Sequence, residues 1–134
     1  MIVVDSNIIG YLYLESDRSE QAERVFRKDP QWVAPLLWRS EFRNVLARYI
    51  RKHRLSVETA QEIMDEALRL MTGQEYEAVS SQVLNLVAQS SCSAYDCEFV
   101  ALAQDLGVSL ITVDKQVLDQ FPAIAISPDK YLRK

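Results

Sequence analysis

The sequence predicts an α/β fold in which a short parallel sheet of about four or five strands is flanked by helices on both faces. Short apolar segments rich in valine and isoleucine recur along the chain, and segments of helical length and periodicity separate them. Two of the apolar segments lead directly into an aspartate. Strands that alternate with helices favour a parallel sheet, because a parallel pair needs a long crossover connection and a helix supplies it.

The expected strands are short because each apolar run is short. The chain begins with one, IVV, and WVA is closed by Pro35. SLITV and AIAI provide two β-branched or alternating runs near the C-terminus. The expected strands cover residues 2–4, 32–34, 74–77, 109–113 and 123–126.

The expected helix boundaries follow from capping residues, glycine and proline. Ser16 or Asp17 is expected to cap the second helix and Ser56 the fourth. Gly73 is expected to stop the fourth helix and Gly107 the sixth. The expected helices cover residues 6–14, 18–28, 36–53, 57–71, 79–90, 94–106 and 115–120.

Length and composition favour one cytoplasmic domain over residues 1–134, without repeats or a linker. Hydrophobic residues make up 49% and charged residues 25% of the chain, as in ordinary globular proteins. No apolar run approaches the roughly 18 residues that cross a bilayer, and Asp5 comes too early for a signal peptide. The two cysteines, Cys92 and Cys97, are expected to be reduced thiols.

Several classes of site are excluded by residue counts. His53 is the only histidine and lies among basic residues, so a histidine-rich zinc site cannot be built. Three glycines are too few and too scattered for a phosphate-binding glycine loop. The net charge of −4 argues against a plain nucleic-acid coat protein, which would carry a large basic field.

Acidic residues stand where a parallel sheet would bind a ligand. Asp5 and Asp114 each follow an apolar strand, and ligands bind beyond the carboxyl ends of such strands. Asp96 opens a helix three residues after Ser93, which matches a capping box. Helix capping explains Asp5, Asp96 and Asp114 about as well as a functional role when each is taken alone.

Glu41 lies at the margin of an apolar stripe on the long helix expected at 36–53. A surface relay of charges with Arg48 and Lys52, farther along the same helix, is one interpretation. The other is a carboxylate aimed at the sheet edge, with the two cations available for phosphate.

Taken together, the four acids indicate a site for a hard divalent cation. Clustered carboxylates repel one another unless a cation neutralises them, and ligand sets made only of oxygen select Mg²⁺ or Mn²⁺. Such an ion lowers the pKa of a bound water, which then loses a proton and becomes a nucleophile that can attack phosphorus in line. We therefore predict hydrolysis of a phosphodiester that leaves 5′-phosphate and 3′-hydroxyl ends.

The ordered motifs resemble the PIN-domain family, and most of all its small bacterial toxin branch, the VapC-type ribonucleases of type II toxin–antitoxin systems. The resemblance covers essentially the whole chain through Asp5-Ser6-Asn7, Glu41, Ser93-Ala-Tyr-Asp96 and Leu110-Ile-Thr-Val-Asp114. It implies a PIN-like fold and a metal-dependent endoribonuclease activity. It also implies inhibition by a cognate antitoxin protein, and a homodimer.

By the same resemblance, Asp5, Glu41, Asp96 and Asp114 would be the catalytic, metal-binding acids. The polar residues beside them, Ser6, Asn7 and Thr112, could orient carboxylates or waters. Position 6 is serine where threonine is common in the family, a change that keeps the hydroxyl. Asp119 is interpreted as part of a solvated helix turn.

The candidates for binding the RNA phosphates are basic residues near these acids: Arg48, Lys52, Arg43 and Lys115. Solvation of a helix surface explains each of them equally well. An apolar surplus in the first half could form the core, or a groove for an antitoxin peptide as the resemblance implies: Tyr11, Leu12, Tyr13, Leu14, Trp32, Leu37 and Trp38.

Other functions stay open at this point. A PIN-like nuclease that processes RNA without being a toxin has the same motifs, and so does a catalytically silent module that binds RNA or protein. A Mg²⁺-dependent phosphoryl-transfer domain also places an aspartate after its first parallel strand. Its phosphatase variant needs D-x-D-x-T, and the residues that follow Asp5 do not match that motif.

Overall fold

The computed structural model describes residues 1–134, and its five strands form one sheet. The strands pair in the order β3-β2-β1-β4-β5, and every pair is parallel. The predicted α/β class and parallel sheet are therefore confirmed. The strands are β1 (Ile2–Val4), β2 (Trp32–Pro35), β3 (Glu75–Tyr76), β4 (Leu110–Ile111) and β5 (Ala125–Ile126).

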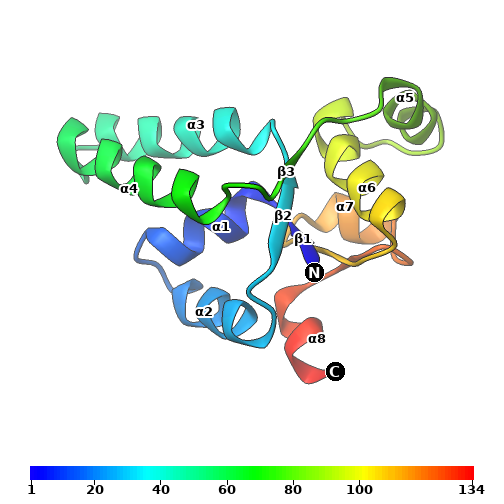
Figure 1. Ribbon diagram of the computed structural model, residues 1–134, viewed down its shortest axis with the longest axis horizontal. Helices are drawn as coiled ribbons and strands as arrows, with labels where there is room; N and C mark the ends of the chain where they lie inside the picture. The colour runs from blue at the N-terminus through cyan, green and yellow to red at the C-terminus, as the bar shows by residue number, and fades with distance from the viewer.

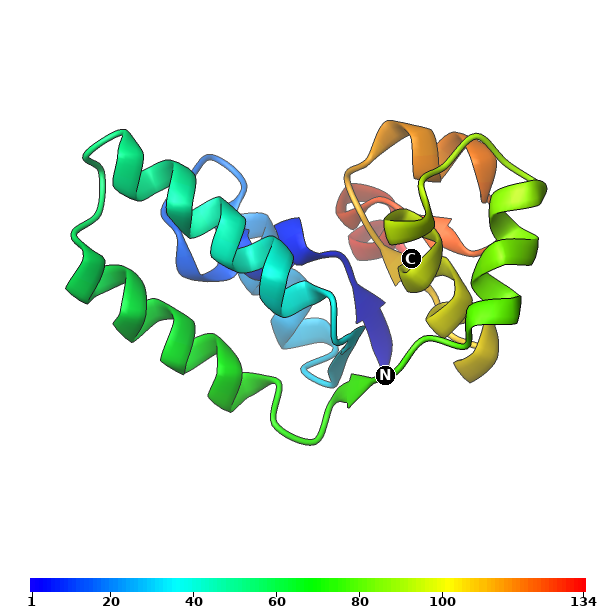
Figure 2. The same ribbon diagram turned by 90° about the horizontal axis from the view of Figure 1, so that it is seen from above.

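Helices cover both sides of this sheet. Helices α1 to α4 lie on one side of the strands and α5 to α7 on the other, while α8 lies beside α2 (Figure 1). Helices α3 and α4 form an antiparallel pair that extends away from the sheet (Figure 2). The helices are α1 (Ser6–Tyr13), α2 (Ser19–Lys28), α3 (Trp38–Arg51), α4 (Val57–Leu70), α5 (Ser80–Ala88), α6 (Ala94–Leu106), α7 (Lys115–Gln120) and α8 (Pro128–Arg133).

The strand order changes direction between β1 and β4. From β1 the chain adds β2 and then β3 on one side, and it later adds β4 and β5 on the other. Helices that leave neighbouring strands toward opposite faces open a crevice at such a point, beyond the carboxyl ends of the strands. Asp5 follows β1 and Asp114 follows β4, so both lie at this switch point.

The core is built on β1 and α6. All three residues of β1 are buried, and α6 is buried continuously from Phe99 to Ala103. Helix α6 ends where predicted, because Gly107 takes a left-handed conformation with φ 66° that glycine adopts without strain. The apolar surplus of the first half belongs mainly to this core: Trp32 and Trp38 are fully buried, and Tyr11 and Tyr13 pack against the cluster.

Some predicted boundaries were wrong. Neither Ser16 nor Asp17 caps α2, whose N-cap position is Arg18. Instead, the backbone N–H of Ser16 donates to Ser19 Oγ at 3.0 Å, and the Ser19 hydroxyl donates to the carbonyl of Leu14, so these groups close the preceding turn. The last three strands are shorter than predicted, and α3 begins two residues later.

Helix α8 was not predicted, although its start carries a recognisable signal. Ser127 caps it by accepting a hydrogen bond from the Lys130 N–H, and Pro128 occupies its first turn. The cysteines Cys92 and Cys97 are free thiols, and both are buried. None of the helices has the length and apolar character needed to cross a membrane.

Candidate active site

Asp5 directly follows β1, and its carboxylate is bonded to Thr112, the residue after β4. It occupies the N-cap position of α1, but its side chain makes no capping hydrogen bond. The Thr112 hydroxyl donates to Asp5 Oδ2 at 2.7 Å, and the Asp5 N–H donates to the carbonyl of Ile111. The capping interpretation of Asp5 is therefore wrong, and its carboxylate is held by a neighbouring strand.

Thr112 also organises the segment that carries Asp114. Its Oγ1 accepts a hydrogen bond from the Asp114 N–H at 3.0 Å, and the Thr112 side chain is 1% exposed. Asp114 Oδ1 in turn accepts from the Val117 N–H at 3.2 Å and caps α7. The capping interpretation is therefore correct for Asp114, and it is compatible with a second role because one carboxylate oxygen suffices for the cap.

Glu41 reaches the site from the first turn of α3. The buried Ser6 hydroxyl donates to Glu41 Oε1 at 2.7 Å, which links this helix to the residue that follows Asp5. Glu41 forms no ion pair with Arg48 or Lys52. The surface relay of charges was therefore the wrong interpretation, because Glu41 turns toward the sheet edge.

Asp96 enters from the other side of the sheet, in the first turn of α6. Ser93 is the N-cap of that helix, and its Oγ accepts a hydrogen bond from the Asp96 N–H at 3.1 Å. Burial raises the pKa of Asp96, and the Ser93 hydroxyl and backbone N–H oppose that shift by favouring the ionised carboxylate. The predicted capping arrangement is confirmed, and it fixes where the Asp96 side chain begins.

The four acids influence one another electrostatically. Burial is the main cause that raises the pKa of Asp5, and the negative charges of Asp96 and Asp114 raise it further against the opposing Thr112 bond. Burial likewise raises the pKa of Glu41, with added repulsion from Asp5 and Asp96. Burial and then Asp114 raise the pKa of Asp96. The fold thus concentrates negative charge at one edge of the sheet.

A hollow of about 160 Å³ lies beside Asp5 and Glu41. Its remaining lining residues are Ser6, Asn7, Asn44, Val45 and Arg48. Sequence reasoning missed Asn44, although it stands one turn after Glu41 and therefore on the same side of α3. It also missed Glu98, whose charge raises the pKa of Glu41. The position of Glu98, two residues after Asp96, gave little warning.

The four basic candidates for RNA binding lie in different places. Arg48 lines the hollow next to Glu41, whereas Lys52 lies just beyond the last residue of α3. Arg43 faces a different, largely apolar hollow between α3 and α4. Lys115 opens α7 and lines a third hollow together with Lys130 and Lys134. The fold therefore brings Arg48, and not the other three, to the hollow that Asp5 and Glu41 line.

The donor chemistry fits a hard divalent ion, although the side chains do not form a ready-made cage. Nowhere do three or more histidine, cysteine, aspartate or glutamate side chains lie close enough together to hold one ion. Ionised carboxylates repel one another and therefore do not gather without a cation. Each of Asp5, Glu41 and Asp114 accepts a hydrogen bond from the protein. Carboxylate, hydroxyl and amide oxygens are the ligands that Mg²⁺ and Mn²⁺ prefer.

Comparison with known proteins adds a family match. Residues 2–124 match the sequence profile described as the PIN domain. Over 126 residues the chain is 30% identical to Ribonuclease VapC3 of Pyrobaculum aerophilum, an alignment that covers 92% of this chain and 96% of that protein.

Solved structures share the fold across nearly the whole chain. The crystal structure of PAE2754 from Pyrobaculum aerophilum superposes with a TM-score of 0.77 at 19% identity, covering 98% of this chain and 93% of that one. FitAcB from Neisseria gonorrhoeae gives 0.72 at 17% identity, with coverage of 96% and 98%. A toxin–antitoxin complex from Klebsiella pneumoniae gives 0.67 at 17% identity, with coverage of 96% and 98%.

Proposed function

This chain belongs to the PIN-domain family, and on that premise we propose that it is an endoribonuclease that depends on Mg²⁺ or Mn²⁺. The observation that carries the proposal is that Asp5 and Glu41 line one hollow at the switch point, where Thr112 joins Asp5 to the Asp114 backbone and Asp96 lies close enough to repel both Asp5 and Glu41. Carboxylates that lie close together without a neighbouring cation destabilise the folded protein, and such clusters are typical of sites that bind cations. The similarity to a protein named Ribonuclease VapC3 supports RNA as the substrate.

The four acids would hold the ion, and the neighbouring hydroxyl groups would orient them. Thr112 restrains Asp5, and Ser6 restrains Glu41, each through one hydrogen bond of 2.7 Å. Asn7 and Asn44, which line the same hollow, offer amide groups to waters or to the sugar–phosphate chain. When bound, a divalent ion supplies an acidified water and a positive charge at the phosphate.

Arg48 is the cation best suited to neutralise the scissile phosphate. It lines the same hollow as Glu41, and its exposed guanidinium can donate two parallel hydrogen bonds to phosphate oxygens. Its charge opposes the repulsion that the acids exert on RNA. We assign Lys52, Arg43 and Lys115 at most to binding the strand farther from the cut, since none of them lines that hollow.

Cleavage of a labelled single-stranded RNA tests the proposal. We expect wild-type protein to cut the RNA with added Mn²⁺ or Mg²⁺, to stop on chelation, and to leave 5′-phosphate ends. Asp5→Asn should lose activity by at least 100-fold, whereas Asp119→Asn, which neutralises an exposed acid on α7, should cleave normally. Binding of RNA and metal without cleavage would instead identify a silent binding module.

We further propose that the protein is the toxin of a toxin–antitoxin pair in the cytoplasm. The structural neighbour that supports this is the one described as a toxin–antitoxin complex from Klebsiella pneumoniae. The partner would be a cognate antitoxin, and the active form would be a homodimer. The whole of residues 1–134 would act as one PIN-like domain.

Induced expression in a bacterial host distinguishes a toxin from a nuclease that processes RNA without harm. We expect the wild-type protein to stop growth and Asp5→Asn to permit it. Co-expression of the neighbouring small reading frame should restore growth, and the two proteins should purify together. Cleavage without growth arrest favours the processing role. Light scattering of the purified protein measures its oligomeric state.

A further inference from the structure

Helix α3, which carries Glu41, begins without a cap of its own. Its N-cap residue is Leu37, which has helical dihedral angles and no capping side chain. The first N–H groups of a helix need partners, and its N-terminus favours negative charge. Glu41 is the acidic residue within the first turn. A second carboxylate, that of Glu75 on the edge strand β3, bonds to side chains of the same turn.

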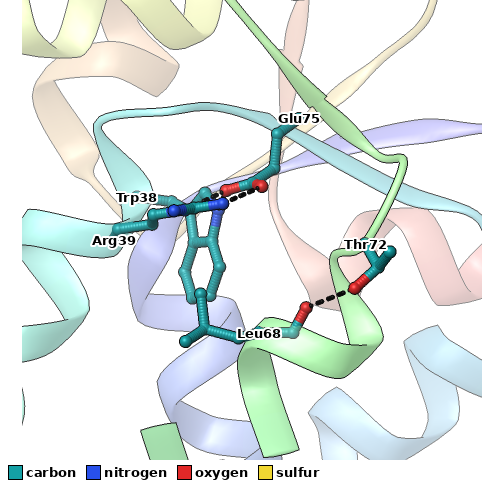
Figure 3. Close-up of polar contacts among 5 residues, drawn as sticks. All are labelled: Trp38, Arg39, Leu68, Thr72 and Glu75. Carbon is teal, nitrogen blue, oxygen red and sulfur yellow. Dashed lines mark hydrogen bonds and ion pairs between the residues drawn. The ribbon is translucent and has the colours of Figure 1, made fainter. Parts of the chain in front are cut away.

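Glu75 accepts hydrogen bonds from two consecutive residues of that first turn (Figure 3). Its Oε2 accepts hydrogen bonds from Trp38 Nε1 at 2.7 Å and from Arg39 Nε at 2.6 Å. Its Oε1 accepts a third from Arg39 Nη2 at 2.5 Å. The two bonds from one guanidinium fix direction as well as distance, since the fork of Arg39 matches the carboxylate. We call these three residues the α3 clamp.

Two of the three clamp residues are enclosed, whereas the Arg39 side chain is 40% exposed. The Glu75 side chain is 13% exposed and Trp38 is fully buried. The hydrogen bonds from Arg39 outweigh burial and lower the pKa of Glu75. On the other side, the Trp38 ring lies 6.2 Å from that of Phe42, and in Figure 3 it extends toward Leu68 of α4. The first turn of α3 is therefore held between an edge strand and a neighbouring helix.

Glu41 lies in the same turn, three residues after Trp38. Asp5, Asp96 and Glu98 all repel its carboxylate, and Ser6 makes its only side-chain hydrogen bond. O–H···O hydrogen bonds span only about 2.5–3.0 Å, so a displacement of more than a few tenths of an ångström weakens this bond of 2.7 Å. A small shift of α3 along its axis would therefore release Glu41 from the site, and repulsion favours such a shift.

We propose that Glu75 is a positioning residue, which grips Trp38 and Arg39 and thereby holds Glu41 among the other acids. The proposal rests on the proposed metal-dependent function of those acids. This role for Glu75 would explain the function of β3, a strand of two residues that pairs only with β2. The backbone of β3 also accepts from the Leu36 N–H, so the connection between β2 and α3 is fixed by backbone and side chains together.

Mn²⁺ titration of Glu75→Ala, followed by electron paramagnetic resonance, tests the clamp without relying on cleavage. We expect the Mn²⁺ dissociation constant to rise about 10-fold or more, as for other groups that orient metal ligands. Ser127→Ala, which removes the cap of α8 far from the acids, is the control for a general loss of stability. It should leave Mn²⁺ affinity unchanged. Arg39→Ala keeps the Trp38–Glu75 bond and serves if Glu75→Ala does not fold.

A double-mutant cycle shows whether Glu75 acts through Glu41. Glu75→Ala should weaken Mn²⁺ binding in the wild-type background and have no further effect in Glu41→Gln, since coupled residues are not additive. Additive losses, or equal losses in Ser127→Ala, would overturn the clamp. The clamp alone is overturned if the wild-type protein binds Mn²⁺ and cleaves RNA, and Glu75→Ala and Arg39→Ala bind Mn²⁺ and cleave RNA equally well. Wild-type protein that does neither overturns the proposed function as well.

Discussion

Thr112 and Asp5 are separated by 107 positions in sequence and joined by a hydrogen bond of 2.7 Å. The same Thr112 oxygen accepts the N–H of Asp114, so one buried hydroxyl connects two of the proposed metal ligands. A hydroxyl can donate one hydrogen bond while it accepts another, which a methyl group of the same size cannot do. The identity of this side chain therefore matters more than its volume.

Thr112→Val is expected to weaken the site while preserving its shape. Asp5 loses the bond that restrains it, and the partly buried Asp114 N–H loses its acceptor, at a cost of about 1 kcal/mol in unfolding free energy. We expect Mn²⁺ affinity and RNA cleavage to fall about 10- to 100-fold. Calorimetry and a cleavage assay measure the two effects. Thr112→Ser keeps the hydroxyl, so its Mn²⁺ affinity and cleavage rate should stay near those of the wild-type protein. Wild-type affinity and cleavage in Thr112→Val would contradict the assignment.

Asp5→Asn is expected to raise the melting temperature of the metal-free protein at pH 7.5. Burial raises the pKa of Asp5 in the folded state above its ordinary value of 3.8. A raised folded pKa contributes stability that is complete below the unfolded value and is lost as pH rises through the folded value. Asparagine does not ionise and therefore avoids this loss. We expect a gain of a few degrees by calorimetry, with no gain for Asp119→Asn.

The pH dependence of this stability has an opposing contribution. Arg39 lowers the pKa of Glu75 below its ordinary value of 4.5. The stability that Glu75 contributes is therefore present above that value and is lost as pH falls through the folded value.

The gain from Asp5→Asn should shrink as the pH is lowered toward 4, where wild-type Asp5 becomes protonated. A melting temperature lowered by Asp5→Asn at pH 7.5 would contradict the proposed repulsion.

Metal binding is expected to release protons. The pKa values of Asp5, Glu41 and Asp96 are all raised, chiefly by burial, whereas a bound divalent ion favours their ionised forms. Mn²⁺ affinity should therefore fall as the pH approaches the ordinary carboxyl values of 3.8 and 4.5, beginning above them. Calorimetric titration in two buffers of different ionisation enthalpy counts the protons released. Identical heats in both buffers would rule out this linkage.

Arg48 and Lys52 are expected to differ in their contribution to RNA binding. Arg48 lines the hollow beside Glu41, whereas Lys52 follows the end of α3. In an Asp5→Asn background that binds without cutting, Arg48→Ala should reduce the slope of log affinity against log salt by about 0.7, the value for one phosphate contact on a single strand. Fluorescence anisotropy at several salt concentrations measures the slope. Lys52→Ala should change it less, and equal changes would place the RNA along the whole of α3.

The sequence by itself determined the α/β class, the parallel sheet and the position of most helices. Those features depend on local patterns: β-branched runs, helical periodicity, and caps such as Ser56, Ser93 and Gly107. It also placed Asp5 and Asp114 after strands. The cap of α2 was wrong because the Ser16 and Ser19 hydroxyls hydrogen-bond within the turn before that helix. Helix α8 could have been predicted from Ser127 and Pro128.

Tertiary structure alone decided how those residues meet. The order of strands placed β4 beside β1, which brought Thr112 to Asp5. The packing of α3 turned Glu41 toward Ser6 and away from its own helical neighbours, and it brought Arg39 to Glu75, a contact that no local pattern indicates. Hydrogen bonds between residues far apart depend on strand order and helix packing, whereas periodicity and capping report only on neighbours within a few positions of one another.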